Sequence, residues 1–219
     1  MLLTSVHITK KGPLMPENKS FTKVSTTKVR ILKEAKALFS ELGYKGASVR
    51  KIASKVGIRE SALYNHFKNK EEIFLFIAKD IFASPFSFSE ESIQDSALKG
   101  KPFLKKYAMQ YKLLAFDKDN ESMFRILLIE LLQNKVLREQ FMSEFHDKNV
   151  KILSEGFFVM MQNNIVRSGD PMMMSYEFLS TLFYIRLQVT LLRFDSLGTN
   201  SLSTQFEKHV DFFWESIKV

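Results

Sequence analysis

Apolar residues recur every three or four positions along most of this chain, which is the spacing of one face of an α-helix. The first clear run is "ILKEAKALFSEL", residues 31–42, where apolar side chains are interleaved with lysines and glutamates. Further runs of the same spacing follow to the end of the chain. No stretch alternates apolar and polar residues for long enough to form a sheet. The pattern therefore predicts an all-α protein of about nine helices.

The first predicted helix ends at Gly43, a residue type that readily closes a helix C-terminus. Ser48 then suits the N-cap of a second helix, and Gly57 after it supplies the positive φ that a sharp turn needs. The third helix is predicted over about 59–67. Two short helices joined in this way form a helix-turn-helix, here residues 48–67, whose second helix lies in the major groove of DNA.

The fourth helix opens at Asn69, where Glu72 three residues later forms an Asn variant of the capping box. The segment "KEEIFLFIAKDIFA" is apolar nearly all round after Glu72. Such a helix has to be covered on several sides. We therefore expect it to join a small first module, residues 25–83, to a larger body, residues 84–219.

Helical periodicity continues through the body, after a weakly defined stretch that contains Pro85, Gly100 and Pro102. Asp170 before Pro171 is a strong start signal, because a capping residue is followed by proline at the first helical position. A last helix is expected after residue 201 or 203. The other helices are predicted over about 102–116, 121–132, 134–163 and 170–194.

Positive charge is concentrated in the first part of the chain. Residues 1–83 hold 16 lysines and arginines against 7 acids, whereas residues 84–219 hold 16 against 17, and the net charge is +8. Residues 1–24 show no helical period and are expected to form a flexible basic tail. A basic module on a neutral body favours contact with a polyanion, although a lysine-rich soluble surface has the same composition.

The composition argues against several kinds of chemistry. The chain has no cysteine, which removes disulfides, thiolate zinc sites and thiol catalysis. Its four histidines have no metal-ligand spacing, and it lacks a P-loop, a GxSxG motif and a glycine-rich nucleotide turn. We therefore expect no metal, no cofactor and no enzymatic activity. No segment suits a bilayer span or a secretory signal, so a cytoplasmic location without membrane contact is expected.

Several motifs occur in order within the first module. They are "LFSELGY" at the end of the first helix, "IA" and "VG" in the second, "LYNHF" in the third and "NKEEIF" at the start of the fourth. Together, over residues 27–81, they resemble the DNA-binding region of the tetracycline-repressor (TetR) family. The resemblance implies a regulator, expected to be a repressor, that binds a palindromic DNA operator as a homodimer and is released by a small-molecule effector.

The resemblance also implies roles for individual residues. The start of the second helix would contact phosphate, with Arg50 reaching toward a base, and the start of the third would read the sequence. Tyr64 and His66 match the usual phosphate-contacting pair, and Lys70 adds a cation at the start of the fourth helix. The predicted DNA-contacting residues are Ser48, Val49, Arg50, Arg59, Glu60, Ser61, Ala62, Tyr64, Asn65, His66 and Lys70.

Two of these positions depart from the family pattern. Arg59 stands where serine or threonine is common, and Glu60 stands where lysine or glutamine is common. Arginine can pair with guanine and a carboxylate can accept from cytosine N4, so we expect a changed operator rather than lost binding. The competing interpretation is that Tyr64 only packs its ring and that His66 and Arg50 are simply solvated.

The body is rich in methionine and aromatic residues. Such side chains can line an adaptable apolar cavity, although at helical spacing they more often form core. The family resemblance implies a pocket here, and an apolar or amphipathic effector fits the composition. Gln133 and Arg186 are further polar groups that such a pocket could use. The predicted ligand-binding residues are Tyr107, Tyr111, Phe124, Tyr184 and Gln188.

The last two helices resemble the pair through which the family dimerises as a four-helix interface. Two recognition helices about one DNA turn apart would then read a palindrome. The alternative is a helical ligand-binding adaptor without a DNA role, against which the basic first module argues. The predicted interface residues are Phe183, Leu187, Leu191, Phe206, Val210, Phe213 and Trp214.

Overall fold

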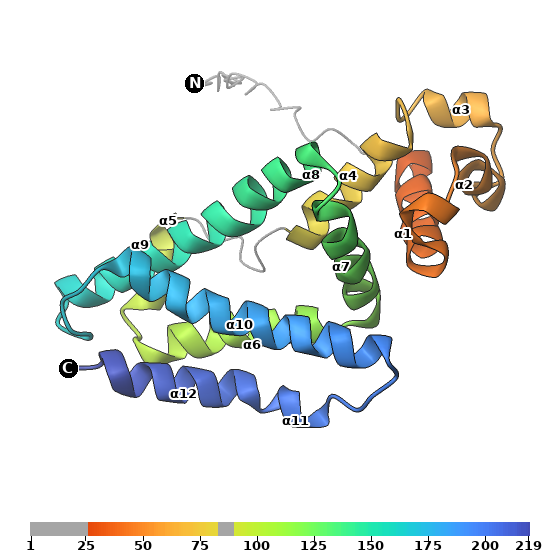
Figure 1. The fold of residues 1–219 in the computed structure, drawn as a ribbon. Helices are drawn as coiled ribbons and strands as arrows, with labels where there is room; N and C mark the ends of the chain where they lie inside the picture. The colour runs from red at the N-terminus through yellow and green to blue at the C-terminus, as the bar shows by residue number, and fades with distance from the viewer. Residues whose placement is uncertain (1–25, 83–89) are drawn as a thin grey trace, which may run out of the picture.

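The structure is a computed structural model that describes residues 26–82 and 90–219. These residues are helical almost throughout, and the β-structure among them is one isolated bridge between Val166 and Lys218. Figure 1 shows a small head, made of the first three helices, at one end of a larger helical body. The predicted all-α class and its division into a helix-turn-helix head and a helical body are confirmed. The predicted tail, residues 1–24, lies outside the described residues.

The head consists of α1 (Thr26–Gly46), α2 (Val49–Val56) and α3 (Glu60–Tyr64), and α4 (Lys70–Phe82) leads from it into the body. The first helix was predicted to end at Gly43. This residue does break the regular helix, with a φ of 72°, but α1 resumes after it and ends at Gly46. The third helix is shorter than the predicted 59–67, because the chain turns after Tyr64.

The body consists of α5 (Glu90–Ala97), α6 (Lys101–Phe116), α7 (Lys118–Leu131), α8 (Lys135–Gln140), η1 (Phe141–Asp147), α9 (Lys148–Gln162), α10 (Pro171–Phe194), α11 (Asn200–Ser203) and α12 (Gln205–Ile217). The helix predicted over 134–163 is a continuous rod of α8, η1 and α9 whose middle segment is π-helical. The described residues therefore form more segments than the nine expected, because the helix predicted over 134–163 is subdivided, α5 occupies part of the undefined stretch, and the short α11 precedes α12.

Several helices begin at a side chain that satisfies free backbone N–H groups, as a helix N-terminus requires. Ser48 Oγ accepts from the N–H of Lys51 at 3.2 Å at the start of α2. Asp170 Oδ1 accepts from the N–H of Met172 at 2.8 Å and of Met173 at 3.3 Å, which fixes the start of α10 next to Pro171. Both caps stand where the sequence predicted them.

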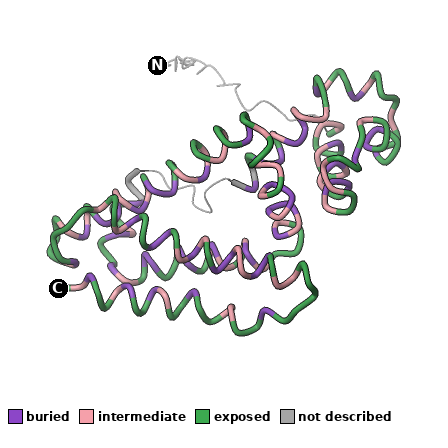
Figure 2. The backbone as a smooth tube through the Cα atoms, in the orientation of Figure 1, coloured by how far each residue is buried: buried purple, intermediate pink, exposed green. Residues whose placement is uncertain are grey.

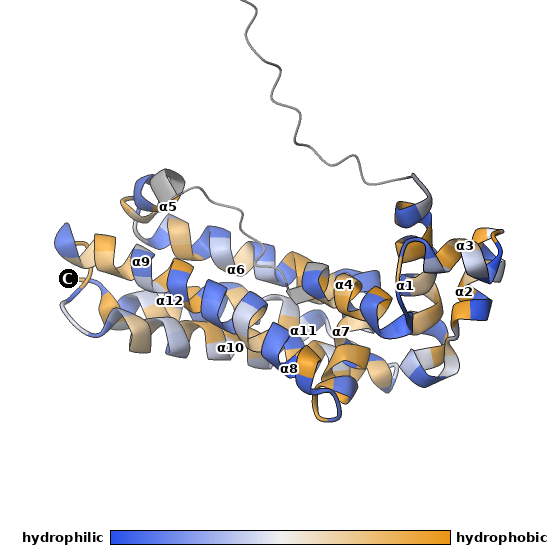
Figure 3. Ribbon diagram, turned by 90° about the horizontal axis from the view of Figure 1, so that it is seen from above, coloured by the Kyte–Doolittle hydropathy of each residue, from blue (hydrophilic) through white to orange (hydrophobic). Residues whose placement is uncertain are grey.

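One apolar core extends from the head through α4 into the body (Figure 2). In the head, the buried side chains of α1, α2 and α3 meet those of α4, including Phe39 and Phe74, whose rings lie edge to face at 5.2 Å. In the body, α10 packs against α9, α6 and α12. The C-terminus lies at the end of the body farthest from the head (Figure 3). Within the described ranges, every helix falls short of the length and apolar character needed to cross a membrane.

Gly156 shows how closely two body helices approach. It is buried on α9, and a Cβ atom added there would lie 2.7 Å from Cε1 of Phe103 on α6. Gly156→Ala should therefore lower the free energy of unfolding by about 1–3 kcal/mol through overpacking, despite the better helix propensity of alanine. Urea denaturation followed by circular dichroism measures this. Lys151→Ala, at an exposed position of the same helix, is the control, and equal stability of the two variants would contradict the prediction.

Candidate nucleic-acid interface

The turn between α2 and α3 is closed by Gly57. This residue adopts a left-handed conformation, with φ 76° and ψ 35°, and its N–H donates to the carbonyl of Ser54 at 3.1 Å. The N–H of Ile58 donates to the carbonyl of Ala53 at 3.0 Å, which completes a C-cap of the Schellman type. Ala53 is buried near this turn, and its small side chain allows α2 and α3 to pack closely. This is the helix-turn-helix geometry predicted from the sequence.

The start of α3 leaves its side chains free to contact a partner. Arg59 occupies the N-cap position, and its carbonyl accepts from the N–H of Ala62 at 3.0 Å. Its side chain is exposed and makes no capping hydrogen bond, as expected for an arginine at a position where serine or threonine is common. Leu63 and Phe67 are fully buried and anchor the opposite side of the helix.

The predicted DNA-contacting residues of α2 and α3 share one region of the head. Figure 1 places α2 and α3 at the end of the molecule away from the body. Tyr64 is 51% exposed, whereas Val49 is half-buried against the core. Ala62 and His66 are also half-buried, and the remaining predicted residues here are exposed: Ser48, Arg50, Arg59, Glu60, Ser61 and Asn65.

Lys70 has a role that sequence reasoning missed. Its Nζ donates to the carbonyls of Tyr44 at 2.8 Å and Ala47 at 2.9 Å and lies 4.2 Å from the centroid of the Tyr44 ring. Burial lowers the pKa of Lys70, and the charge of Glu130 opposes this. The ammonium group, predicted to be available for phosphate, is therefore engaged in holding the junction of α1 and α2 against the start of α4.

Two more cations of the head also bind carbonyl groups at helix C-termini, where the helix dipole favours positive charge. Arg30 Nη2 donates to the carbonyl of Val56 at 2.5 Å, and Lys51 Nζ donates to the carbonyl of Gly46 at 2.9 Å. Part of the excess positive charge of the head is thus structural. Local spacing did not indicate which lysines and arginines would serve this purpose, because the bonded residues of one pair are 26 positions apart.

The predicted ligand-binding residues fall into two groups. Tyr107, Tyr111 and Phe124 are buried together between α6, α7 and α10. Tyr184 is 58% exposed, and with Gln188 it lines a surface groove of about 490 Å³ between α10 and α12. Tyr184 and Gln188 therefore do not lie with the three buried residues, because α10 presents them to its outer side.

The predicted interface residues also divide, between the surface and the core. Phe206, Val210 and Phe213 are buried within the protomer, because this side of α12 packs on α6 and α10. Their assignment to a dimer interface is corrected accordingly. Phe183, Leu187 and Trp214 are half-buried, and Leu191 is exposed. The apolar residue that α12 does expose is Phe212, at 80%, which the sequence prediction omitted.

These features define an all-helical protein with a helix-turn-helix head, and comparisons with known proteins agree. Residues 31–77 match the family model described as bacterial regulatory proteins, tetR family. The chain is 39% identical over 61 residues to the HTH-type transcriptional repressor AcnR of Corynebacterium diphtheriae, covering 28% of this chain and 32% of that protein. The matched segment thus spans about a third of that relative.

Two further comparisons extend into the body. The chain is 25% identical over 141 residues to the fatty acid metabolism regulator protein of Bacillus subtilis, covering 64% of this chain and 71% of that protein. The fold is similar to that of a TetR-family transcriptional regulator from Mesorhizobium loti, with a TM-score of 0.69 and 18% identity over 90% of this chain and 100% of the other. Residues 31–77 thus carry the sequence pattern of the tetR family, and the chain as a whole has the fold of a TetR-family regulator.

Lys70→Ala tests the internal role of this lysine. The substitution leaves two partly buried carbonyls without their donor, so it should lower the free energy of unfolding by about 1–2 kcal/mol. Chemical denaturation of the full chain measures the loss. The control is Lys68→Ala, which removes an exposed lysine of the same segment. An equally small effect of both substitutions would show that the Lys70 contacts do not stabilise the head.

Proposed function

We propose that the protein is a DNA-binding transcriptional regulator, a repressor, that recognises an operator through α3. The observation that carries the proposal is the geometry of α3, which is anchored by Leu63 on one side while the side chains of Arg59, Glu60 and Ser61 are exposed on the other. These exposed groups lie on a head with excess positive charge, which favours association with a polyanion. The AcnR relative, itself named a transcriptional repressor, supports the same function.

The residues of α3 suit two kinds of contact with duplex DNA. Arg59 can donate two hydrogen bonds to O6 and N7 of guanine, and Glu60 can accept from N4 of cytosine in the major groove. Tyr64 and His66 lie one turn further along and can donate to phosphate, which positions the helix without reading sequence. Ser48 and Arg50 at the start of α2 would contact the phosphates across the groove.

The proposed regulator acts as a homodimer that reads a palindrome with two heads. Exposed apolar side chains support an interface on the outer side of α10 and α12. Tyr184, Leu191, Phe194 and Phe212 are all more than half exposed in the single protomer, although each is large and apolar. Such a surface gains stability by being covered in an assembly.

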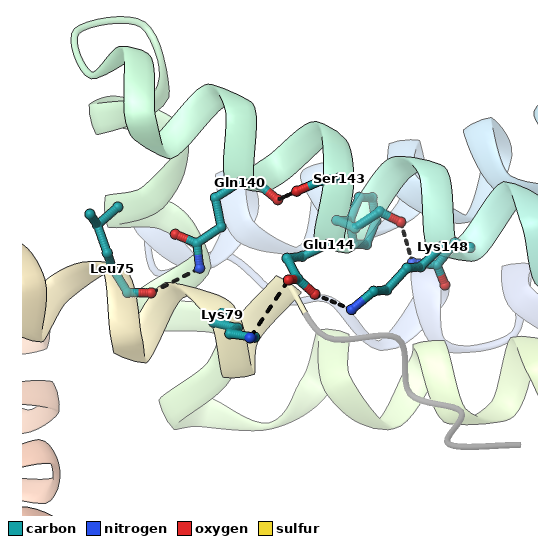
Figure 4. Close-up of polar contacts among 8 residues, drawn as sticks. Leu75, Lys79, Gln140, Ser143, Glu144 and Lys148 are labelled. Carbon is teal, nitrogen blue, oxygen red and sulfur yellow. Dashed lines mark hydrogen bonds and ion pairs between the residues drawn. The ribbon is translucent and has the colours of Figure 1, made fainter.

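The body would control DNA binding through α4. Gln140 Nε2 donates to the carbonyl of Leu75 at 2.9 Å, and Lys79 and Glu144 form an ion pair at 3.7 Å, so η1 and the end of α8 are tied to α4 (Figure 4). An effector that displaces η1 would move α4 and change the spacing of the two heads. Linkage of this kind typically changes the affinity for DNA by about 1–3 kcal/mol.

Arg59→Ala tests recognition of the operator. Against duplex DNA from upstream of the protein's own gene, the variant should lose discrimination at one base pair, by about 1–3 kcal/mol. Tyr64→Ala should instead weaken binding to all sequences about equally, because it removes a phosphate contact. Gel-shift titrations with single-base operator variants measure both effects. Lys135→Ala in the body is the charge-matched control, and failure of the wild type to bind any fragment at low salt would refute the proposed function.

Phe212→Glu tests the dimer interface. A carboxylate at this 80% exposed position of α12 should yield monomers, because it would be buried without a partner in the proposed interface. Sedimentation velocity of the full chain measures the oligomeric state. Phe158→Glu, at an exposed position of α9, is the matched control and should leave the dimer intact. A Phe212→Glu dimer of unchanged stability would place the interface elsewhere.

A further inference from the structure

Several buried polar atoms of the body have no hydrogen-bond partner, and those of Arg186 and Tyr111 lie next to each other. In the part of the chain that the structure describes, such side-chain atoms belong to Tyr111 on α6, Glu121 on α7, and Arg186 and Thr190 on α10. Buried polar groups in folded proteins nearly always have a partner. The adjacent pair of Arg186 and Tyr111 therefore points to a partner that is not part of the chain.

Arg186 contributes three of these atoms. It is 1% exposed, and none of Nε, Nη1 and Nη2 makes a hydrogen bond of good geometry, while the Tyr111 hydroxyl is close enough to act on its pKa. Its guanidinium carbon lies 3.9 Å from the centroid of the Phe124 ring and 5.8 Å from that of Tyr111, so the group is held between two aromatic rings. Burial lowers the pKa of Arg186 and the Tyr111 hydroxyl opposes this, but a guanidinium stays charged in proteins.

The one buried carboxylate nearby does not neutralise this charge. Burial raises the pKa of Glu121, and the charges that act against this rise come from Arg125 and Arg193, not from Arg186. Among the described residues, no carboxylate lies within ion-pair distance of Arg186. A buried positive charge without an anion is strongly unfavourable, so an anion from outside the chain would gain a strong interaction here.

An apolar groove lies next to Tyr111 and Phe124, the two rings that hold Arg186. It has a volume of about 280 Å³ and lies between η1 and α10, with Phe141, Phe145 and Phe183 among its lining residues. The ring of Phe145 lies 6.2 Å from that of Tyr111, and the ring of Phe183 lies 5.8 Å from that of Phe124. One layer of phenylalanine rings thus separates the groove from the two rings that hold Arg186.

We propose that the body binds an amphipathic monocarboxylic acid, with its carboxylate at Arg186 and its apolar part in the groove beside η1. Arg186 donates two hydrogen bonds to the carboxylate in the bidentate geometry that guanidinium groups favour, and the hydroxyls of Tyr111 and Thr190 donate to the remaining lone pairs. The rings of Phe145 and Phe183 turn aside to admit the ligand. This inference rests on the proposed function, because it names the chemical class of the effector.

The charge of Arg186 favours a ligand with a single negative charge. One guanidinium balances the charge of one carboxylate, whereas a phosphate dianion would require a second cation. The groove also explains how binding would reach the head. Its wall includes Phe141 and Phe145 of η1, the same segment that holds α4 through the Lys79–Glu144 ion pair. π-Helical segments within α-helices often occur at functional sites.

Isothermal titration calorimetry on the full-length protein without DNA tests the inference with matched pairs of probes. Dodecanoate is compared with 1-dodecanol, and 2-naphthoate with 2-naphthalenemethanol, so that each pair shares its apolar part and differs in charge. At least one acid should bind about tenfold or more tightly than its alcohol. The pair that shows this preference identifies whether the apolar part is a chain or a ring system.

Arg186→Met should abolish the preference for the acid while leaving the weak binding of the alcohol unchanged. Arg167→Met, an exposed arginine whose Nε donates to the carbonyl of Lys218 far from the groove, should keep the preference. Where Arg186→Met does not fold by circular dichroism, Arg186→Lys takes its place. It keeps the charge but loses the bidentate geometry, so acid affinity should fall about tenfold.

Three results would overturn the inference: equal affinity for acid and alcohol, no binding of either acid below about 1 mM, or an unchanged preference in the Arg186 variant. A gel shift without any acid tests DNA binding separately. Acid binding by a protein that binds no DNA would refute the proposed regulator and keep the acid site. DNA binding without acid binding would refute the acid site alone.

Discussion

The apolar side chains of α4 are covered by α1 on the head side and by α7 and η1 on the body side, so this helix belongs to both parts of the core. Ile73, Phe74 and Ile77 are buried, and no arrangement that separates the head from the body could keep them out of water. The position of the recognition helix relative to the body therefore follows from hydrophobic burial along α4 together with the direct packing of α1 on α7. Polar contacts such as Lys70 with the carbonyl of Tyr44 then fix the details of that position.

The cations of the head and of the body contrast in how they are satisfied. Arg30, Lys51 and Lys70 in the head each donate to backbone carbonyls, and of these three only Lys70 is partly buried. Arg186 in the body is more deeply buried, yet its guanidinium nitrogens make no hydrogen bond of good geometry with the described residues. The first arrangement stabilises a fixed head, and the second is suited to a body whose conformation depends on a bound anion.

The sequence predicted the local geometry of the helix-turn-helix more successfully than the arrangement of the candidate residues in the body. The N-cap at Ser48, the turn at Gly57 and the buried Leu63 follow from local rules of helix capping and spacing, and the structure agrees with all three. The role of Lys70 could not be foreseen, because its acceptors are more than 20 residues away in the sequence. In α12, Phe212 and Phe213 are adjacent and chemically identical, so only packing decides that one is exposed and the other buried.

The sequence by itself determined the helical class, the order and approximate bounds of the helices, and the helix-turn-helix with its exposed recognition residues. These features depend on contacts between residues a few positions apart, which composition and spacing record directly. Only the tertiary structure decided which faces of α10 and α12 are outward, where the cations of the head are bound, and that Arg186 is buried between the rings of Tyr111 and Phe124. Those outcomes depend on how distant helices pack, because burial and the distances between side chains exist only once the helices have been brought together.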